Sequence, residues 1–239
     1  MNRINYQKEL EKILAGLGER VPRLFLHSCC APCSSYCLEY LCRYFAITVF
    51  YFNPNISAEE EYRKRVREQK RLIAQYNAER KGYPIEIVEG DYEPDSFFRM
   101  ARGYENCPEG GERCFKCFEM RLGETAHKAK EGGFDYFATT LTISPLKNAE
   151  KINEIGQALA KETGVAWLPS DFKKKEGYKR SIELSAQYDL YRQDYCGCAY
   201  SKAEREKEKK LRNLANYGTI IETVCTEGAE KEIGMEKED

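Results

Sequence analysis

Cysteine is the residue type through which this sequence most clearly predicts chemistry. The 239 residues include 11 cysteines but only two histidines. The cysteines fall into three short groups and two separate positions: Cys29, Cys30, Cys33 and Cys37; Cys107, Cys114 and Cys117; Cys196 and Cys198; and the separate Cys42 and Cys225. Thiolates bind soft metals and exchange electrons, so this clustering indicates metal ligands or redox thiols. The scarcity of histidine argues against a histidine-based hydrolytic triad or a zinc protease.

The first two groups have spacings that are typical of metal ligands. Cys29 and Cys30 follow an apolar run and precede a helix, whose N-terminus favours anionic thiolates. Side chains of adjacent residues diverge, so this pair suits a metal cluster or two neighbouring sites better than one tetrahedral ion. Cys114 and Cys117 form a C-x-x-C motif, which zinc and iron–sulfur sites both use. Spacing alone leaves these two alternatives open.

The remaining thiols have less definite roles. Cys37 lies one helical turn after Cys33 and is expected to pack, whereas Cys33 either ligates a metal or tunes the site. Cys107 is ambiguous, and Cys42 and Cys225 are expected to be inert.

The third group, Cys196-Gly197-Cys198, favours redox chemistry. A disulfide between residues two apart closes a small ring, and Gly197 relieves part of the backbone strain. Strained disulfides are easily reduced, which is typical of catalytic pairs. Metal ligation by the same thiols is the competing interpretation.

Alternating strands and helices must position these groups. Apolar and β-branched runs predict strands at 23–27, 46–52, 84–88, 134–139 and 165–168. Helices are predicted at 5–18, 34–44, 57–77, 97–102, 115–130, 148–163 and 177–190. Ser34 is the predicted N-cap of the second of these helices. This pattern indicates an α/β fold, with a mostly parallel sheet and helices on both faces. The site then lies beyond the carboxyl ends of the strands. There, His27 is either a proton donor, a hydrogen-bonding neighbour of the site or a satisfied buried histidine.

The length of 239 residues allows one sizeable domain or at most two small ones, and the composition excludes several classes of protein. Hydrophobic residues make up 42% of the chain and charged residues 32%, with a formal net charge of -1. Nucleic-acid binding must therefore come from local patches. No apolar run reaches the roughly 20 residues that cross a bilayer, and residues 1–20 lack a signal-peptide pattern, so we expect a cytoplasmic protein with no membrane partner. We expect a single catalytic domain over 1–205 and a charged, partly disordered tail over 206–239.

Two basic stretches lie beside predicted site loops. They are Arg63, Lys64, Arg65, Arg67, Lys70 and Arg71, and Lys173, Lys174, Lys175, Lys179 and Arg180. Basic runs are usually solvated faces, but interleaved tyrosines suit an RNA backbone with stacked bases. No glycine-rich phosphate loop follows a strand, and Pro32 and the cysteines would crowd a phosphate, which argues against ATP or NAD.

Six motifs, taken in order, resemble one known family. They are HSCCAPCS, YFNPNI, GERCFKCFEMRL, TTLTISPLKN, DFKKKEGYKRS and YRQDYCGCAYS. Over about residues 23–201 the chain resembles the QueH type of epoxyqueuosine reductase. The resemblance implies reduction of epoxyqueuosine to queuosine at the wobble position of tRNAs with GUN anticodons, the last step of queuosine biosynthesis. It also implies a fold similar to the adenine nucleotide α-hydrolase (HUP) group.

The resemblance also implies roles for individual residues. By motif position, the ligands of a [4Fe–4S] cluster would be Cys29, Cys30, Cys114 and Cys117. Cys196 and Cys198 would be the redox-active pair. We add Asp194 as a candidate catalytic acid or metal ligand, with Asp171 as the other, although each is equally a turn or capping residue. A second iron near the cluster and the identity of the external electron donor stay open.

Two functions of other classes are alternatives. A cluster-dependent tRNA thiolation enzyme on a similar fold would need ATP, and the missing phosphate loop argues against it. A zinc-binding module that binds RNA without catalysis would be colourless, whereas an iron–sulfur protein is brown.

Overall fold

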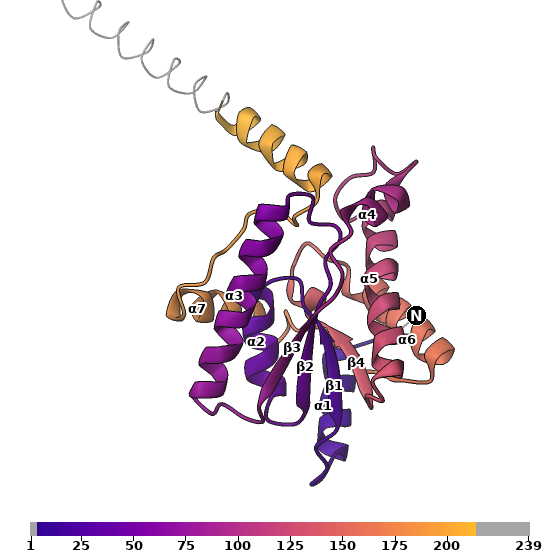
Figure 1. Ribbon diagram of the computed structural model, residues 1–239, viewed down its shortest axis with the longest axis vertical. Helices are drawn as coiled ribbons and strands as arrows, with labels where there is room; N and C mark the ends of the chain where they lie inside the picture. Colours follow the sequence, from indigo (N-terminus) through magenta and orange to yellow (C-terminus); the bar gives the residue numbers. More distant parts are fainter. Residues whose placement is uncertain (1–3, 214–239) are drawn as a thin grey trace, which may run out of the picture. The chain divides into compact units, whose positions relative to one another are not determined.

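The first of two compact units is built on a parallel sheet. The computed structural model describes residues 4–213 of the chain, which divides into residues 1–193 and 194–239. The first unit contains a five-stranded sheet of order β3-β2-β1-β4-β5, with every pair parallel (Figure 1). The strands are β1 (Arg23–His27), β2 (Ala46–Tyr51), β3 (Ile85–Glu89), β4 (Tyr136–Thr139) and β5 (Ala166–Trp167). The helices are α1 (Tyr6–Gly16), α2 (Ala31–Leu41), α3 (Glu59–Ala78), α4 (Pro94–Ala101), α5 (Glu112–Glu131), α6 (Ala149–Thr163) and α7 (Gly177–Gln187), with a 3₁₀ turn, η1 (Thr140–Ile143).

These elements confirm the predicted α/β fold with a parallel sheet. Each predicted strand overlaps an observed one, and helices lie on both sides of the sheet, α2 and α3 on one and α5 and α6 on the other (Figure 1). The likeness to the adenine nucleotide α-hydrolase group stays a prediction.

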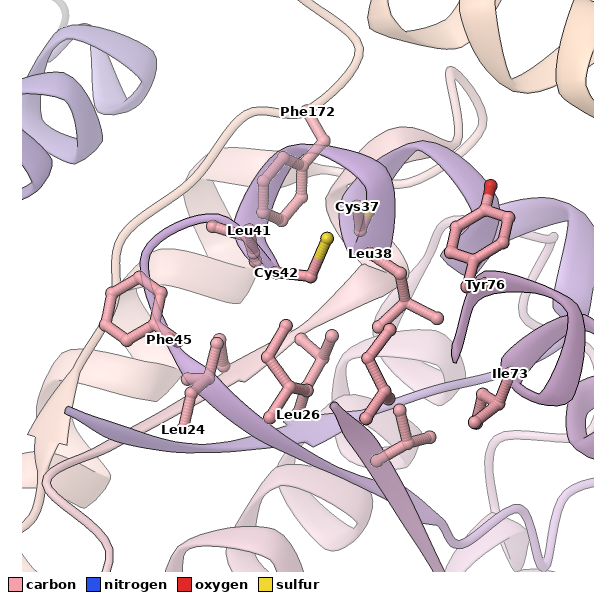
Figure 2. Close-up of a cluster of buried hydrophobic side chains, with 14 of the residues drawn as sticks. Leu24, Leu26, Cys37, Leu38, Leu41, Cys42, Phe45, Ile73, Tyr76 and Phe172 are labelled. Atoms are coloured by element: carbon pink, nitrogen blue, oxygen red, sulfur yellow. The ribbon is translucent and has the colours of Figure 1, made fainter. Parts of the chain in front are cut away.

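The alternation of side chains along β1 explains why both faces of the sheet are covered. Leu24 and Leu26 belong to one hydrophobic core, which α1, α2, α3 and α7 complete. Figure 2 shows part of this core, including Cys37 and Cys42. Phe25, between the two leucines, belongs to a second core with residues of α5 and α6. Successive strand residues point to opposite faces, so a strand that is apolar throughout requires helices on both.

The order of the strands reverses beside β1. The chain runs from β1 to β2 and β3, then returns to β4 on the other side of β1. His27, at the end of β1, is in register with Phe50 of β2 and Thr139 of β4. Parallel sheets bind ligands beyond the carboxyl ends of their strands at such a switch point. The first cysteine group follows β1 at this place.

Helix α2 begins earlier than the sequence predicts. Its N-cap is Cys30, in extended conformation, and Pro32 lies in the first turn, where its missing N–H removes no hydrogen bond. The prediction of Ser34 as N-cap is therefore wrong. The Ser34 hydroxyl is buried and donates to Oε1 of Gln69 over 2.8 Å. Cys33 is consequently held on the first turn of a rigid helix.

The second unit is described only up to residue 213, with a helix over 199–213. The rest of the predicted tail, 214–239, and Cys225 lie outside the described residues. Nowhere in 4–213 is a helix both long and apolar enough to pass through a bilayer.

Candidate metal and redox site

Three thiols of the first cysteine group converge at the switch point. The Sγ atoms of Cys29, Cys30 and Cys33 all lie within 4.8 Å of one another, and those of Cys29 and Cys30 are 3.8 Å apart. Adjacent side chains were expected to diverge, but here the chain turns from strand to helix at Cys30, and the thiols meet. Cys29 and Cys30 are buried, and none of the three forms a disulfide. Clustered, buried thiols fit a metal cofactor, because thiolates are the ligands that soft metals and iron–sulfur clusters prefer.

Hydrogen bonding and nearby charge select which of these thiols ionises first. Hydrogen bonds from Cys30 and Cys33, together with the charges of Lys147 and Arg121, hold the pKa of Cys29 well below its usual value. The hydrogen bond with Cys29 and burial raise the pKa of Cys30 to about 11. Hydrogen bonds with Cys29 and Cys30, together with burial, raise the pKa of Cys33 well above its usual value. The group is thus arranged to hold a thiolate at Cys29, the form that binds metals and attacks electrophiles.

The second cysteine group lies at the start of α5. Cys114 is in the first turn, where its Sγ accepts the N–H of Gly110 over 3.2 Å. The buried Arg113 donates to the carbonyl oxygens of Tyr104 and Cys107 and so orders the segment before the helix. Cys117 follows one turn later and is buried.

The structure places both groups in one region. Cys114 packs against the hydrophobic core that contains Cys29 and Cys30. Arg121, fully buried on α5, approaches Cys117 Sγ with Nη1 at 3.8 Å and His27 Nε2 with Nε at 3.3 Å. Because His27 ends β1 two residues before Cys29, Arg121 connects the second cysteine group to the strand that carries the first.

His27 is a neutral, buried histidine. Its Nδ1 lies 2.8 Å from Thr139 Oγ1, and its Nε2 lies 3.1 Å from the carbonyl oxygen of Phe52. Either neutral tautomer of His27 therefore finds a hydrogen-bond partner. A doubly protonated ring would carry a positive charge against the Arg121 guanidinium, and the two charges would repel each other. Burial, followed by the charge of Arg121, lowers the pKa of His27 to about 3. Of the roles predicted for this residue, the structure favours a satisfied buried histidine that neighbours the site.

The other cysteines of the first unit have separate roles. Cys37 and Cys42 are buried in the opposite hydrophobic core, where each thiol donates to a carbonyl oxygen of its own helix (Figure 2). This confirms that Cys37 packs. Cys107 is partly buried, and its carbonyl oxygen accepts from Arg113.

Sequence reasoning left the role of Cys33 open, did not single out the buried Arg121, and assigned the buried Arg65 to a basic stretch on the surface. Arg121 lies four residues after Cys117, and a basic residue one turn beyond a cysteine motif was the available signal. Arg65 forms an ion pair with Glu61, at 2.7 Å, and its charge acts on Cys30. A buried positive charge beside a thiol favours its thiolate form, because an opposite charge nearby stabilises the ionised state.

Cys196 and Cys198 belong to the second unit. Gly197, between them, has φ of 115°, a conformation that side-chain-bearing residues rarely adopt. The N–H of Cys196 donates to Ser201 Oγ over 3.1 Å, and Cys198 Sγ accepts the N–H of Ser201 over 3.3 Å. Ser201 thus holds both cysteines in one turn, and their assignment as a redox pair stays a prediction.

Asp194 forms an ion pair with Lys209 on the helix that follows. The hydrogen bond from Lys209 lowers the pKa of the Asp194 carboxyl, which favours its ionised form. Its predicted catalytic role is not decided by this contact.

The basic stretch on α3 is largely neutralised by acids. Arg63 pairs with Glu59, and Arg71 pairs with Glu68 at 2.8 Å. Lys70 pairs with Glu89 of β3. This helix therefore attracts RNA more weakly than its sequence predicts.

The family is shown by comparison with known proteins. The model of the family described as epoxyqueuosine reductase QueH matches residues 24–204. The epoxyqueuosine reductase QueH of Streptococcus pyogenes serotype M1 is 46% identical over 202 residues, which cover 83% of this chain and 78% of that protein. The protein of the same name from Staphylococcus epidermidis is 46% identical over 216 residues, covering 88% and 90%. That from Acinetobacter baylyi is 38% identical, covering 80% and 85%. The chain belongs to the epoxyqueuosine reductase QueH family.

Proposed function

We propose that the chain is an epoxyqueuosine reductase, an oxidoreductase that converts epoxyqueuosine in tRNA to queuosine. In this reaction two electrons and two protons convert the epoxide into an alkene and one water molecule. The observation that carries the proposal is the convergence of the buried Cys29 and Cys30 with the partly buried Cys33 at the switch point of the sheet, in a chain of this family. The thiolate character of Cys29 supports a redox site there.

The cofactor that we propose is a [4Fe–4S] cluster, which supplies electrons one at a time. Its proposed ligands are Cys29, Cys30, Cys114 and Cys117. The soft donor set and the buried positive charge of Arg65 and Arg121 support this assignment, because a cluster with four thiolates carries net negative charge. Zinc fits the same donors, so metal analysis separates the two.

We propose that Cys196 and Cys198 supply the reducing equivalents. Oxidation of their two thiols to a disulfide releases two electrons and two protons, the same number that the epoxide consumes. An external electron donor must then reduce the disulfide before the next turnover. Of the two roles predicted for Asp194, its ionised carboxylate beside Lys209 suits metal ligation better than proton donation.

The partner of the proposed reaction is tRNA with a GUN anticodon. Exposed lysines without an acidic partner among residues 4–213, such as Lys174, are candidates for phosphate contacts. We expect the reaction in the cytoplasm, where thiols are kept reduced.

The test is direct. Anaerobically purified protein is incubated with a reductant and with tRNA that carries epoxyqueuosine, and the nucleosides are analysed by mass spectrometry. We expect loss of one oxygen from epoxyqueuosine without ATP, and a matched reaction without reductant should leave the nucleoside unchanged. Addition of sulfur with a requirement for ATP would instead establish a thiolation enzyme. Binding of the tRNA without any change, by protein that contains zinc, would establish a binding module.

A further inference from the structure

A cavity of about 620 Å³ opens beside the cysteine site of the first unit. Three segments that are distant in sequence, together with Gly110, line it: residues 4–6, 145–150, and 171 with 173–174. Its volume lies within the range of about 300–1,000 Å³ that is typical of pockets for small molecules and cofactors. The cavity can therefore accommodate one nucleoside-sized group.

Two of its walls are connected to the cysteines. Gly110, in one wall, donates its N–H to Cys114 Sγ over 3.2 Å. Another wall, residues 145–150, continues from η1, where Thr140 Oγ1 lies 3.8 Å from Cys29 Sγ. Lys147 of that wall also helps to lower the pKa of Cys29. A group bound in this cavity is therefore next to the residues that hold the proposed cofactor.

Asp171 supplies the cavity with a buried carboxylate whose hydrogen bonding is incomplete. Its side chain is about 10% exposed, and Lys173 Nζ lies 2.7 Å from Oδ1. That contact lacks hydrogen-bond geometry, and no hydrogen bond reaches Oδ1 from the described residues. Lys173 compensates the charge of this carboxylate without a hydrogen bond to Oδ1, and a cationic ligand with N–H groups would supply that hydrogen bond.

The position of Asp171 is fixed from two sides. Its carbonyl oxygen accepts the N–H of Lys174 over 2.9 Å. The preceding Ser170 is bound to the buried Asn153, which accepts its N–H over 3.1 Å and donates to its carbonyl oxygen over 2.9 Å. The carboxylate is therefore presented by a rigid segment, as a specificity-determining group requires.

We propose that this cavity binds the amine-bearing ring of the substrate nucleoside and that the Asp171 carboxylate pairs with its ammonium group. The inference rests on the proposed function. Epoxyqueuosine carries a secondary amine, protonated at neutral pH, that joins the deazaguanine base to a hydroxylated five-membered ring. The epoxide begins at the ring carbon next to the one that bears this amine. Holding the ammonium at Asp171 therefore places the epoxide in the cavity that is lined by Gly110, whose N–H binds Cys114 Sγ.

The test measures selectivity of binding with D171N, which removes the charge and keeps the shape. Two anticodon stem-loop RNAs are compared, one with epoxyqueuosine and one with guanine at the same position. A lost charged hydrogen bond corresponds to a weakening of about tenfold to a hundredfold. We expect that weakening for the epoxyqueuosine RNA and less than about a twofold change for the guanine RNA. D171E should retain most of the selectivity, and D95N, at an exposed aspartate of α4, should behave as the unaltered protein.

A second measurement needs no variant. An RNA with 7-aminomethyl-7-deazaguanine has the ammonium group but lacks the ring, and we expect the unaltered protein to bind it at least about tenfold more tightly than the guanine RNA. Equal affinity for these two RNAs overturns the inference, as does an equal effect of D171N on both RNAs of the first experiment. Failure of the unaltered protein to reduce epoxyqueuosine is a separate outcome, which contradicts the proposed function instead.

Discussion

Arg121 Nη1 approaches Cys117 Sγ at 3.8 Å, one helical turn along α5. The same guanidinium donates to Asn53 Oδ1 over 2.5 Å and meets His27 at 3.3 Å. It is fully buried, so its charge is little screened by water. One side chain therefore holds the second cysteine group against the ends of β1 and β2.

Replacement of Arg121 should affect both stability and iron binding. R121Q leaves buried acceptors without a charged donor, and we expect the free energy of unfolding to fall by about 1–3 kcal/mol. We also expect R121Q to bind less iron per chain than the unaltered protein. R121K keeps the positive charge but lacks the planar guanidinium with its several N–H donors, so its iron content should lie between those of R121Q and the unaltered protein. Urea unfolding and iron analysis measure the two effects. R67Q, at an exposed arginine of α3, is the control. Full iron content in R121Q would show that Arg121 has no part in the cysteine site.

The thiol of Cys33 should support the site without being indispensable to it. Cys33 is hydrogen-bonded to Cys29, and loss of such a neighbour of a metal ligand typically weakens metal binding by about 10–100-fold. We expect C33A to lose iron to a chelator faster than the unaltered protein by a factor of that order. C29A and C30A should bind no iron.

The matched control for Cys33 is C37A, one helical turn further along α2. Cys37 is buried in the opposite core, so this variant should lose some stability and keep its iron. An equal loss of iron in C33A and C37A would indicate general disruption of α2 rather than a role for Cys33 in the site.

The sequence predicted the sheet because each strand is a short apolar run that a turn follows. It also placed Cys29 and Cys30 at the end of β1, because they come directly after a buried strand. It did not predict the start of α2, since Ser34 finds its acceptor on Gln69, 35 residues away. Cys33 meets Cys29 and Cys30 because α2 begins at Ala31, which places Cys33 on its first turn. Local propensity describes neighbours in sequence, whereas these contacts are tertiary.

The burial and the partners of the charged residues were also beyond the reach of sequence reasoning. Arg121 resembles any other basic residue on a helix until Asn53 and His27 are known to meet it. Conversely, the basic residues of α3 form one patch in the sequence, although in the structure Arg71 pairs with Glu68 of the same helix and Lys70 pairs with Glu89 of β3. The effect of a charge depends on its burial and partners, neither of which composition specifies.

Acid should destabilise the protein through His27. The histidine has a pKa of about 6.5 when unfolded and about 3 when folded, so between these values only the unfolded chain binds the extra proton. The free energy of unfolding then falls with decreasing pH, and the loss from this residue is about 2 kcal/mol between pH 7 and pH 5. Urea unfolding at the two pH values measures it. In H27Q the free energy of unfolding should fall by about 2 kcal/mol less between pH 7 and pH 5 than in the unaltered protein. The contributions of carboxylates and cysteines are common to both proteins and cancel in this difference. Parallel pH dependence of the two proteins would contradict a neutral His27.

The redox pair should be separable from the metal site. Cys196 and Cys198 belong to the second unit, and the proposed ligands belong to the first. C196A should therefore keep the brown colour and iron content of the unaltered protein and lose turnover, because a single thiol cannot form the disulfide that releases two electrons. C42A, which alters a packing cysteine, should keep both iron and turnover. Absorption near 400 nm and nucleoside mass spectrometry on the same preparation measure the two properties. A colourless C196A protein would instead place Cys196 among the metal ligands, and full turnover would remove the dithiol from the reaction.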